Sequence, residues 1–269
     1  MASDTTWRWR WNSVLNGLRT MEQDAEVEDF LKSLPSRKGP VTVAFVNAHV
    51  MNLLLPSNSE LIGPLRRTDY VLRDGIGMAI LLRLLGRAPG MNLNGTDLIP
   101  RILHRARGHR LALLGTRNPY LENAAQAICA QIGLSRSDIT VDDGFHDDSH
   151  YLELVRKHRP QFIVLGMGVP KQERVATLLK DNLDYDCVIV SGGAIVDFYG
   201  GKVRRAPALL RAMRMEWLFR LGLEPRRLFR RYLLGNPTFL LHSLQFRLGS
   251  RSHAALAAPE FGNTRIIRQ

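Results

Sequence analysis

The sequence contains few cysteines and no long apolar run, and these absences limit the classes of protein to which it can belong. Its two cysteines, Cys129 and Cys187, are far apart, and each lies in an apolar segment. A disulfide framework or a cysteine-ligated metal site is therefore not expected, and the thiols suit a reducing compartment. No stretch reaches the roughly 18 apolar residues of a membrane-spanning helix, and residues 1–11 lack the apolar segment of a secretory signal. We expect a cytoplasmic protein.

Several catalytic motifs are also missing. The eight histidines are scattered without an HExxH pair, and neither a G-x-S-x-G nucleophile elbow nor a complete G-x-G-x-x-G fingerprint occurs. These absences argue against a metal hydrolase and a nicotinamide enzyme. Four aspartates cluster around Gly144, namely Asp142, Asp143, Asp147 and Asp148. They could hold Mg²⁺ on a phosphate, but turn and capping chemistry explains them at least as well, and we predict no metal site.

Positive charge, by contrast, is abundant. The formal net charge is +12 and the sequence pI is about 10.4, which indicates an anionic partner: a phosphorylated ligand, an acidic membrane surface or nucleic acid. Hydrophobic residues make up 45% of the chain, enough to bury the core of one large domain with an appendage. The placement of the basic residues must decide between these partners.

Short apolar segments alternate with segments of helical periodicity through the middle of the chain. The intervening segments carry apolar residues at three- and four-residue spacing, as amphipathic helices do. This alternation predicts an α/β fold, with a Rossmann-like, mostly parallel sheet and helices on both faces. The predicted strands are Val41–Val46, Asp69–Leu72, Leu111–Leu114, Ile139–Val141, Phe162–Leu165 and Cys187–Val190, with a further candidate at Met91–Asn94.

Polar and glycine residues follow each of the six predicted strands. Parallel sheets bind ligands beyond the carboxyl ends of their strands, so these loops are expected at one edge. One such loop is often polar without a function, but six together predict a site. In chain order they contain Asn47 and His49, Asp74 to Gly77, Gly115 to Asn118, Asp142 to Gly144, Gly166 to Glu173, and Ser191 to Gly193.

The stretch FIVLGMGVPKQE, residues 162–173, carries the strongest of these signals. Gly166 and Gly168 leave the strand in a tight turn, and Pro170 opens a helix. Glycines let an oxyanion approach the backbone, and the first N–H groups of a helix are unpaired at the positive end of its dipole. With the charge of Lys171 added, the junction predicts an anion site.

Asp74 is the carboxylate that we choose as a general base. It stands at a strand end and is followed by Gly75, which keeps its approach open. The alternative is that Asp74 is only a helix cap, kept ionised by Arg73 and the helix that begins near Gly75.

The two ends of the chain differ in composition from its centre. Residues 202–231 hold ten basic and two acidic residues, a net +8. Arginines beside leucine, phenylalanine and tryptophan favour a segment that lies on a membrane or covers a site, with a basic dimer face or a nucleic-acid surface as alternatives. At the other end, Trp7, Trp9 and Trp11 alternate with arginines, which indicates an unstructured tail or a strand edge, or else a membrane interface.

Between about Val43 and Phe239 the chain resembles the WecG/TagA/CpsF family of glycosyltransferases. The resemblance rests on the ordered motifs VNAH, RDGIGM, NGTDL, LLGT, LGMGVPKQE, VSGGAIVDFYGGKVRRAP and MEWLFRLGLEPRRLFRRYLLGNPTFL. It implies an inverting hexosyltransferase that uses a UDP-sugar donor and an undecaprenyl-diphosphate-linked saccharide acceptor, in exopolysaccharide or cell-surface polysaccharide synthesis. It further implies metal-independent transfer without a cofactor, and a C-terminal appendage that docks on the membrane and closes the site.

The resemblance also implies roles for single residues. Asp74 matches the base, and Asn47 and Gln172 match active-site amides. Donor binding is expected of Gly115, Thr116, Gly166, Gly168, Lys171, Gln172, Glu173, Gly192 and Gly193, and contact with the diphosphate or the membrane of Arg220, Arg227, Arg230 and Arg231. Where the family usually carries Thr, two residues before the Asn, this chain has Phe45, so the commonest donor sugar cannot be copied onto it.

We therefore predict an enzyme that is peripherally associated with the inner face of the cell membrane and does not bind nucleic acid. The predicted parts are a tail with a short helix (1–38), a Rossmann-like catalytic core (39–201), a basic helical appendage (202–248) and a disordered tail (249–269). The segment from about Lys202 is predicted to be a conditional lid, without which the core stays folded. The transferred sugar, the acceptor length, the linkage and a homo-oligomeric state stay open, and a non-catalytic basic membrane- or nucleic-acid-binding module is the alternative.

Overall fold

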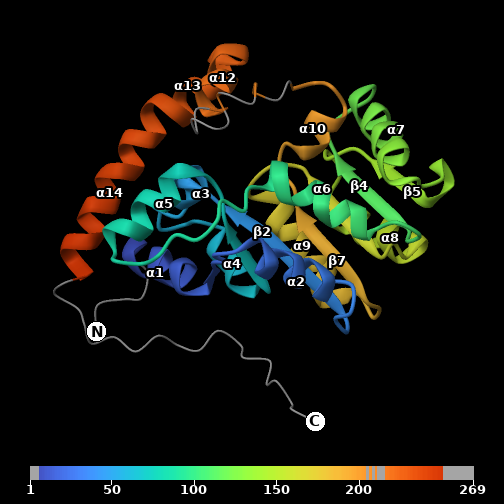
Figure 1. The fold of residues 1–269 in the computed structure, drawn as a ribbon, viewed down its shortest axis with the longest axis horizontal. Coiled ribbons are helices and arrows are strands. Elements are labelled where there is room, and N and C mark those ends of the chain that lie inside the picture. Colours follow the sequence, from blue (N-terminus) through green and yellow to red (C-terminus); the bar gives the residue numbers. More distant parts are fainter. Residues whose placement is uncertain (1–5, 204–205, 208–209, 211–215, 251–269) are drawn as a thin grey trace, which may run out of the picture.

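A parallel sheet of seven strands forms the centre of the molecule (Figure 1). The structure is a computed structural model that describes residues 6–203, 206–207, 210 and 216–250. In spatial order the strands are β1-β3-β2-β7-β6-β4-β5, and every pair is parallel. Their bounds are β1 (Leu18–Arg19), β2 (Pro40–Val46), β3 (Tyr70–Arg73), β4 (Leu111–Gly115), β5 (Ile139–Asp142), β6 (Phe162–Gly166) and β7 (Cys187–Ser191).

Helices connect the strands and cover the sheet. They are α1 (Trp7–Gly17), α2 (Asp24–Ser33), α3 (Ala48–Leu53), α4 (Ile62–Arg67), α5 (Gly75–Leu84), α6 (Gly95–Arg105), α7 (Tyr120–Ile132), the 3₁₀ turn η1 (Arg136–Asp138), α8 (Asp148–His158), α9 (Lys171–Asn182), α10 (Ile195–Tyr199), α12 (Glu216–Leu223), α13 (Pro225–Phe229), the π-helical turn η2 (Arg230–Leu234) and α14 (Gly235–Ser250).

Both faces of the sheet are buried, as the predicted fold requires. Along β4, Leu111 and Leu113 pack with α2, α6, α7 and α10, whereas Ala112 and Leu114 pack with α8 and α9 on the opposite face. A strand that is buried on both sides must be apolar at successive positions, which explains the uninterrupted apolar segments in the sequence. The α/β fold with its parallel sheet and two helical layers is confirmed.

Two local predictions were wrong. Met91–Asn94 is not a strand; this segment is a loop, and Arg73 holds the residues just before it by donating to the carbonyl oxygens of Pro89 and Gly90, at 2.8 and 3.0 Å. The strand predicted at Asp69 begins one residue later, at Tyr70. The Asp69 carboxylate instead accepts hydrogen bonds from the backbone N–H and hydroxyl of Thr42, at 2.9 and 2.8 Å, so it fixes the start of the strand pair.

The tryptophan-rich N-terminus is a helix and not an unstructured tail. Helix α1 turns Trp7 and Trp11 to one side, because residues four apart share a helix face. Trp11 is fully buried, donates from its indole N–H to the Met51 carbonyl at 2.8 Å, and packs against the ring of Phe239. Arg10 is buried as well and donates to the carbonyl oxygens of Leu54 and Leu55.

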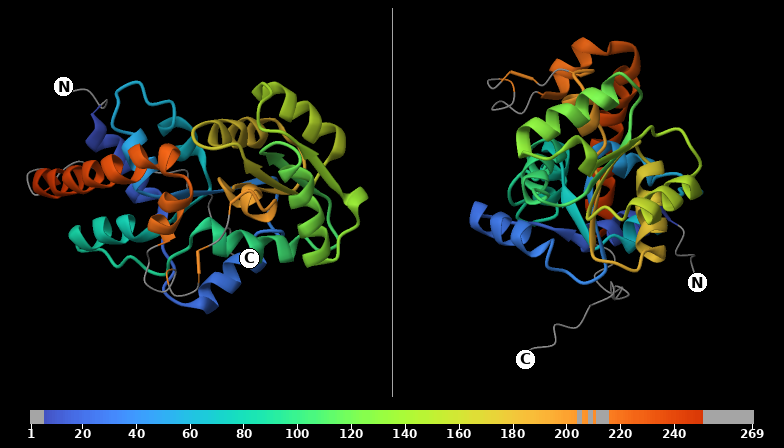
Figure 2. Two further views of the ribbon diagram at one scale, coloured as in Figure 1. Left: turned by 90° about the horizontal axis from the view of Figure 1, so that it is seen from above. Right: turned by 90° about the vertical axis from the view of Figure 1, so that its right-hand side faces the viewer.

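The C-terminal helix α14 lies beside α3 and α5 (Figures 1 and 2). Its Phe239 and Phe246 are buried in the same apolar cluster as Trp11. The last part of the chain therefore packs on the core, and its removal would expose this cluster. That a protein truncated near Lys202 stays folded, and that this segment is a conditional lid, stay predictions. The tail predicted to be disordered lies, from residue 251 onward, outside the described residues. Within the described part of the chain, no helix is both long and apolar enough to cross a membrane.

Candidate active site

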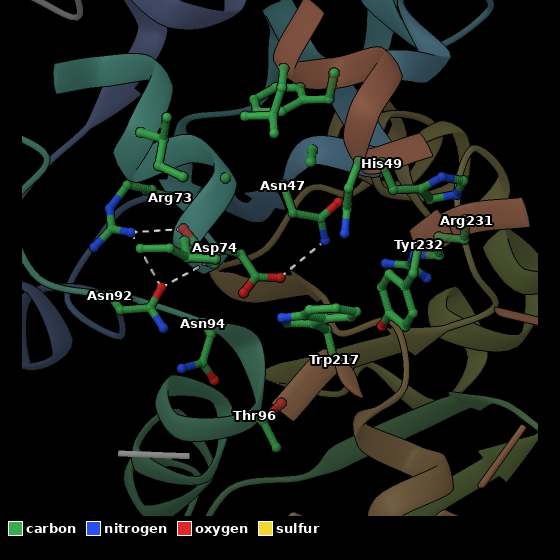
Figure 3. A pocket seen from close by; sticks show the side chains of 18 of the residues that line it. Asn47, His49, Arg73, Asp74, Asn92, Asn94, Thr96, Trp217, Arg231 and Tyr232 are labelled. Atoms are coloured by element: carbon green, nitrogen blue, oxygen red, sulfur yellow. Dashed lines mark hydrogen bonds between the residues drawn. The ribbon is translucent and has the colours of Figure 1, made fainter. Parts of the chain in front are cut away.

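Asn47 and Asp74 meet at the carboxyl ends of the neighbouring strands β2 and β3. Asn47 is the N-cap of α3, and its Oδ1 accepts a hydrogen bond from the Val50 N–H at 3.1 Å. This cap uses the amide oxygen, so the Nδ2 group is left to donate to Asp74 Oδ2, also at 3.1 Å (Figure 3). The sequence thus brings a carboxylate and an oriented amide together.

Asp74 does not serve as a helix cap. It occupies the N-cap position of α5, but its side chain makes no capping hydrogen bond, and the Gly75 N–H is taken by Asn92 Oδ1 at 2.9 Å. Arg73 donates to the carbonyl oxygens of Gly75 and Pro89, and so helps to hold the start of α5 against the following loop. The side chain of Asp74 instead faces into a cavity.

The larger of two neighbouring cavities has a volume of about 690 Å³ and opens in front of Asp74. Its other wall comes from the C-terminal helices, and Figure 3 shows Trp217 and Tyr232 across from Asp74 and Asn47. Leu233, Pro237, Phe239 and Leu240 also line it, so this cavity offers an apolar surface beside a carboxylate and an amide.

The smaller cavity, of about 310 Å³, lies over the carboxyl ends of β4, β6 and β7. Six glycines line it, and the packing of α10 on β6 excludes a larger residue at Gly166, where a Cβ would lie 2.7 Å from Val196 Cγ2. The two cavities meet, because both are lined by Asn47, His49, Asp74, Thr96 and Arg231. Asp74 therefore stands between a glycine-rich chamber and an apolar one.

Gln172 supports the backbone of the smaller cavity. Its Oε1 accepts from the Gly193 N–H at 3.0 Å, and its Nε2 donates to Glu173 Oε1 at 2.8 Å. Glu173 is only 2% exposed, and its burial raises the pKa of the carboxyl to about 7. It lines neither cavity. Its contact with Gln172 therefore orients the amide that holds Gly193.

Comparison with known proteins supports the resemblance seen in the motifs. Residues 15–253 match the family described as Glycosyl transferase WecG/TagA/CpsF family. The chain belongs to this family. Because the match extends over most of the chain, including the C-terminal helices, the family assignment covers both cavities and identifies the protein as a glycosyltransferase.

Two relatives of this glycosyltransferase carry the same name, N-acetylglucosaminyldiphosphoundecaprenol N-acetyl-beta-D-mannosaminyltransferase. The protein of Staphylococcus aureus (strain NCTC 8325 / PS 47) is 25% identical over 170 residues, which are 62% of this chain and 66% of the relative. The protein of Bacillus subtilis (strain 168) is 24% identical over 183 residues, 67% of this chain and 70% of the relative. The matched parts thus span about two thirds of each relative.

The predicted donor-binding residues of this family member divide into three groups. Thr116, Gly166, Gly168, Gln172, Gly192 and Gly193 line the smaller cavity. Gly115 does not; it lies where β4 and β6 approach so closely that a Cβ would meet the Gly166 backbone at 2.6 Å. Lys171 and Glu173 also point elsewhere, since Lys171 Nζ donates to the carbonyl oxygens of Gly144, at 2.9 Å, and His146.

Of the four predicted arginines, Arg231 lies at the junction of the two cavities. Arg230, one position earlier in η2, is exposed and lines neither cavity. Arg220 and Arg227 lie in α12 and α13, but their side chains are outside the described part of the structure. Of the predicted arginines whose side chains are described, Arg231 is therefore the one that lines the cavities with Asp74.

Sequence reasoning gave no role to several residues of the site. His49 lines both cavities, and its burial, with the nearby positive charge of Arg231, lowers the pKa of the imidazole to about 4, so it is neutral at pH 7. Lys202 Nζ donates to Thr116 Oγ1 at 3.2 Å at the wall of the smaller cavity. His49 belongs to the VNAH motif and Thr96 to the NGTDL motif, but neither residue was given a role from the sequence.

The aspartates near Gly144 do not form the carboxylate cluster that Mg²⁺ would need. Asp148 pairs with the guanidinium of Arg174, at 3.0 and 3.3 Å, and Asp147 is the N-cap residue of α8. Asp142 and Asp143 face imidazoles instead.

Proposed function

We propose that this glycosyltransferase is an inverting hexosyltransferase that moves a sugar from a UDP-sugar to a polyprenyl-diphosphate-linked saccharide in surface-polysaccharide synthesis. The observation that carries the proposal is the meeting of two unlike cavities at Asp74. A transfer between two substrates needs two adjoining chambers with the reactive group where they join. The printed names of the relatives, which are transferases acting on a diphosphoundecaprenol-linked sugar, support the acceptor class.

In this proposal Asp74 takes the proton from the acceptor hydroxyl as that oxygen attacks the anomeric carbon of the donor. The bond from that carbon to the diphosphate breaks as the new bond forms on the opposite face, so the configuration inverts. Asn47 holds the carboxylate through its 3.1 Å hydrogen bond and so limits its rotation. General-base catalysis of this kind contributes about 10²–10⁴-fold in rate.

The donor diphosphate is proposed to lie in the smaller cavity. There the backbone at Gly166, Gly168, Gly192 and Gly193 permits close approach, and α9 begins just beyond the turn that Gly168 closes with a φ of +81°. Arg231 and Lys202, which both line this chamber, supply positive charge. Since arginine and lysine can neutralise the leaving diphosphate, we propose that transfer proceeds without a metal ion at the reacting centre.

The acceptor is proposed to enter the larger cavity from a membrane. Leucines and a phenylalanine are exposed on the helices around its rim, and arginines lie among them. Apolar side chains can contact lipid while each basic group gains roughly 1 kcal/mol at an anionic surface. The exposed apolar residues are Leu218, Leu223, Phe229, Leu233, Leu234, Leu240, Leu241, Leu244 and Leu248.

A donor panel tests the proposal. The purified chain is incubated with a set of UDP-sugars and a polyprenyl-diphosphate saccharide in lipid vesicles, and products are identified by mass spectrometry. We expect one donor to be transferred with inversion, at a rate that a chelator leaves largely unchanged. Turnover with no donor would refute the proposed substrates. The ring of Phe45 lines the smaller cavity, so the Phe45→Thr variant should alter the donor preference.

A further inference from the structure

Two imidazoles and one carboxylate converge beyond the outer strand β5. Asp142 ends this strand, His146 lies in the loop that follows, and His150 lies in the first turn of α8, so the three are spaced four residues apart. His150 Nε2 is 2.7 Å from Asp142 Oδ2, and His146 Nε2 is 3.2 Å from Asp142 Oδ1. The two imidazole rings are stacked, with their centroids 4.2 Å apart.

We propose that Asp142, His146 and His150 bind a divalent transition-metal ion of the zinc type. One ligand atom from each residue lies within 4.8 Å of the others. Zinc–nitrogen and zinc–oxygen distances of about 2.0–2.2 Å in a tetrahedron place ligand atoms roughly 3.4 Å apart. The 2.7 and 3.2 Å contacts reach the two different oxygens of Asp142, so rotation of the side chains must bring one atom of each residue to this separation around an ion. A water molecule, or Asp143 Oδ1 at 3.6 Å from His146 Nε2, can complete the coordination.

The donor set selects the class of ion. Imidazole nitrogens suit Zn²⁺, Co²⁺ and Ni²⁺, whereas Mg²⁺ and Ca²⁺ prefer oxygen ligands throughout. With two imidazoles and one carboxylate, the site matches the first class. This differs from the magnesium-bearing carboxylate cluster considered from the sequence, because two of the three ligands are imidazoles and Asp148 of that cluster is paired with Arg174.

The loop that carries the ligands is held in place by its own neighbours. The His146 N–H donates to the Tyr151 hydroxyl at 3.0 Å, and this hydroxyl donates to the Asp143 carbonyl at 2.8 Å. Lys171 Nζ donates to the carbonyl of Gly144, between the ligands. A site whose backbone is fixed in advance loses little entropy on binding an ion.

An ion at this site would act on the smaller cavity through the backbone. Gly144 and Phe145 lie between Asp142 and His146 and line that cavity, and the guanidinium of Arg117 stacks on the Phe145 ring at 3.9 Å. One ion bound at both ends of this short loop would restrict the motion of Gly144 and Phe145, which line the cavity. The proposed general base, Asp74, belongs to the other half of the sheet, so the ion has no part in the bond-making step.

The competing explanation is a set of ordinary hydrogen bonds, in which Asp142 accepts from both imidazoles. That arrangement needs a proton on Nε2 of each ring. Metal binding needs the same two nitrogens without protons. The two explanations therefore predict opposite results when the protein is titrated with an ion.

The experiment is a titration of the full chain, freed of any histidine tag and of bound metal, with Co²⁺ and then Zn²⁺. We expect one Co²⁺ per chain, with the visible absorbance of a tetrahedral complex, displaced by one Zn²⁺. Zinc should also slow amide hydrogen exchange across residues 142–150. The His146→Ala and His150→Ala variants should bind at least about 100-fold more weakly, since loss of an outer-shell partner alone costs 10–100-fold.

The control variant is His104→Asn, on an exposed position of α6 outside the cluster, which should bind as the unmodified chain does. Thermal unfolding of each variant without metal checks that the fold is kept. The proposal is overturned if the unmodified chain takes up no stoichiometric ion, or if the His146→Ala, His150→Ala double variant binds as tightly as the unmodified chain. It is equally overturned if His104→Asn abolishes binding.

Discussion

The two cavities that meet at Asp74 are built in opposite ways. The smaller one is walled largely by backbone and glycine at the ends of β4, β6 and β7, where atoms cannot move without disturbing the sheet. The larger one is walled on one side by tryptophan, tyrosine and leucine from helices at the end of the chain. A backbone wall suits a group of fixed shape such as a diphosphate, whereas a wall of large side chains can adapt to a lipid-linked sugar. The following predictions test this difference.

The largest expected effect is on stability, at the point where the larger cavity shares a residue with the core. Phe239 lines that cavity, is only 1% exposed and packs on Trp11. Phe239→Ala should reduce the free energy of unfolding by about 3–5 kcal/mol, measured by urea denaturation. Leu241→Ala, on an exposed position of the same helix, should change it by no more than about 0.5 kcal/mol. Equal stability of the two variants would show that α14 is only loosely attached.

The next effect belongs to Asp74, one of the residues that line both cavities. Asp74→Asn should fold normally and slow transfer at least about 100-fold in kcat, because the amide cannot accept the hydroxyl proton. Circular dichroism and a transfer assay measure the two properties. Asp29→Asn, on an exposed carboxylate of α2, is the matched control and should transfer at the normal rate. An unchanged kcat in Asp74→Asn would remove this residue from the mechanism.

A pair of substitutions should separate the two cavities. Gly166→Ala places a methyl group against Val196 and should raise the donor KM, whereas Trp217→Ala removes a wall of the larger cavity and should raise the acceptor KM. An effect of about tenfold corresponds to 1.4 kcal/mol. Gly63→Ala, in α4 with open space around its Cβ, controls for the added methyl group. If both substitutions raise the same KM, the assignment of donor and acceptor is wrong.

The smallest effect concerns Glu173, which contacts Gln172, the residue that holds the Gly193 backbone at the smaller cavity. Burial raises the pKa of Glu173 from 4.5 to about 7, so between these values the folded protein keeps a proton that the unfolded chain has lost. The free energy of unfolding should therefore fall as the pH rises from about 4.5 to 7, and should level off above this range. Urea denaturation across this range measures the slope. In Glu173→Gln this pH dependence of the free energy of unfolding should disappear. If the slope persists in the variant, other groups cause it.

Much of the fold could be predicted because its central strands are buried on both faces and read as short apolar segments. The structure of the two ends of the chain could not be predicted in this way. The alternation of tryptophan and arginine in residues 7–11 has the period of a strand, but α1 is a helix in which Arg10 is buried by donating to two carbonyl groups. Such compensation depends on partners more than 40 residues away, which no local pattern contains.

In the candidate site, too, some residues could be predicted from the sequence and others could not. Asn47, Asp74 and the glycines could be predicted because strand ends of a parallel sheet converge and each residue follows its strand directly. The roles of Glu173 and Lys171 could not, because neighbouring positions on one helix turn point in different directions. Their side chains bind Gln172 and the Gly144 loop, and neither lines a cavity. The meeting of His146 and His150 with Asp142 could not be predicted either, because it depends on the turn between β5 and α8.

The packing of α1 on α14 also constrains how the protein is made. Trp11 and Phe246 touch across more than 200 residues of sequence, so a chain emerging from the ribosome carries an uncovered apolar helix until almost all of it has been synthesised. The sheet can assemble first, since its strands from β2 to β7 are complete by residue 191. The larger cavity closes only afterwards, when α14 docks. A newly made chain would therefore gain its glycine-walled chamber before its apolar one, and nascent chains stalled before residue 235 should depend on chaperones to stay soluble.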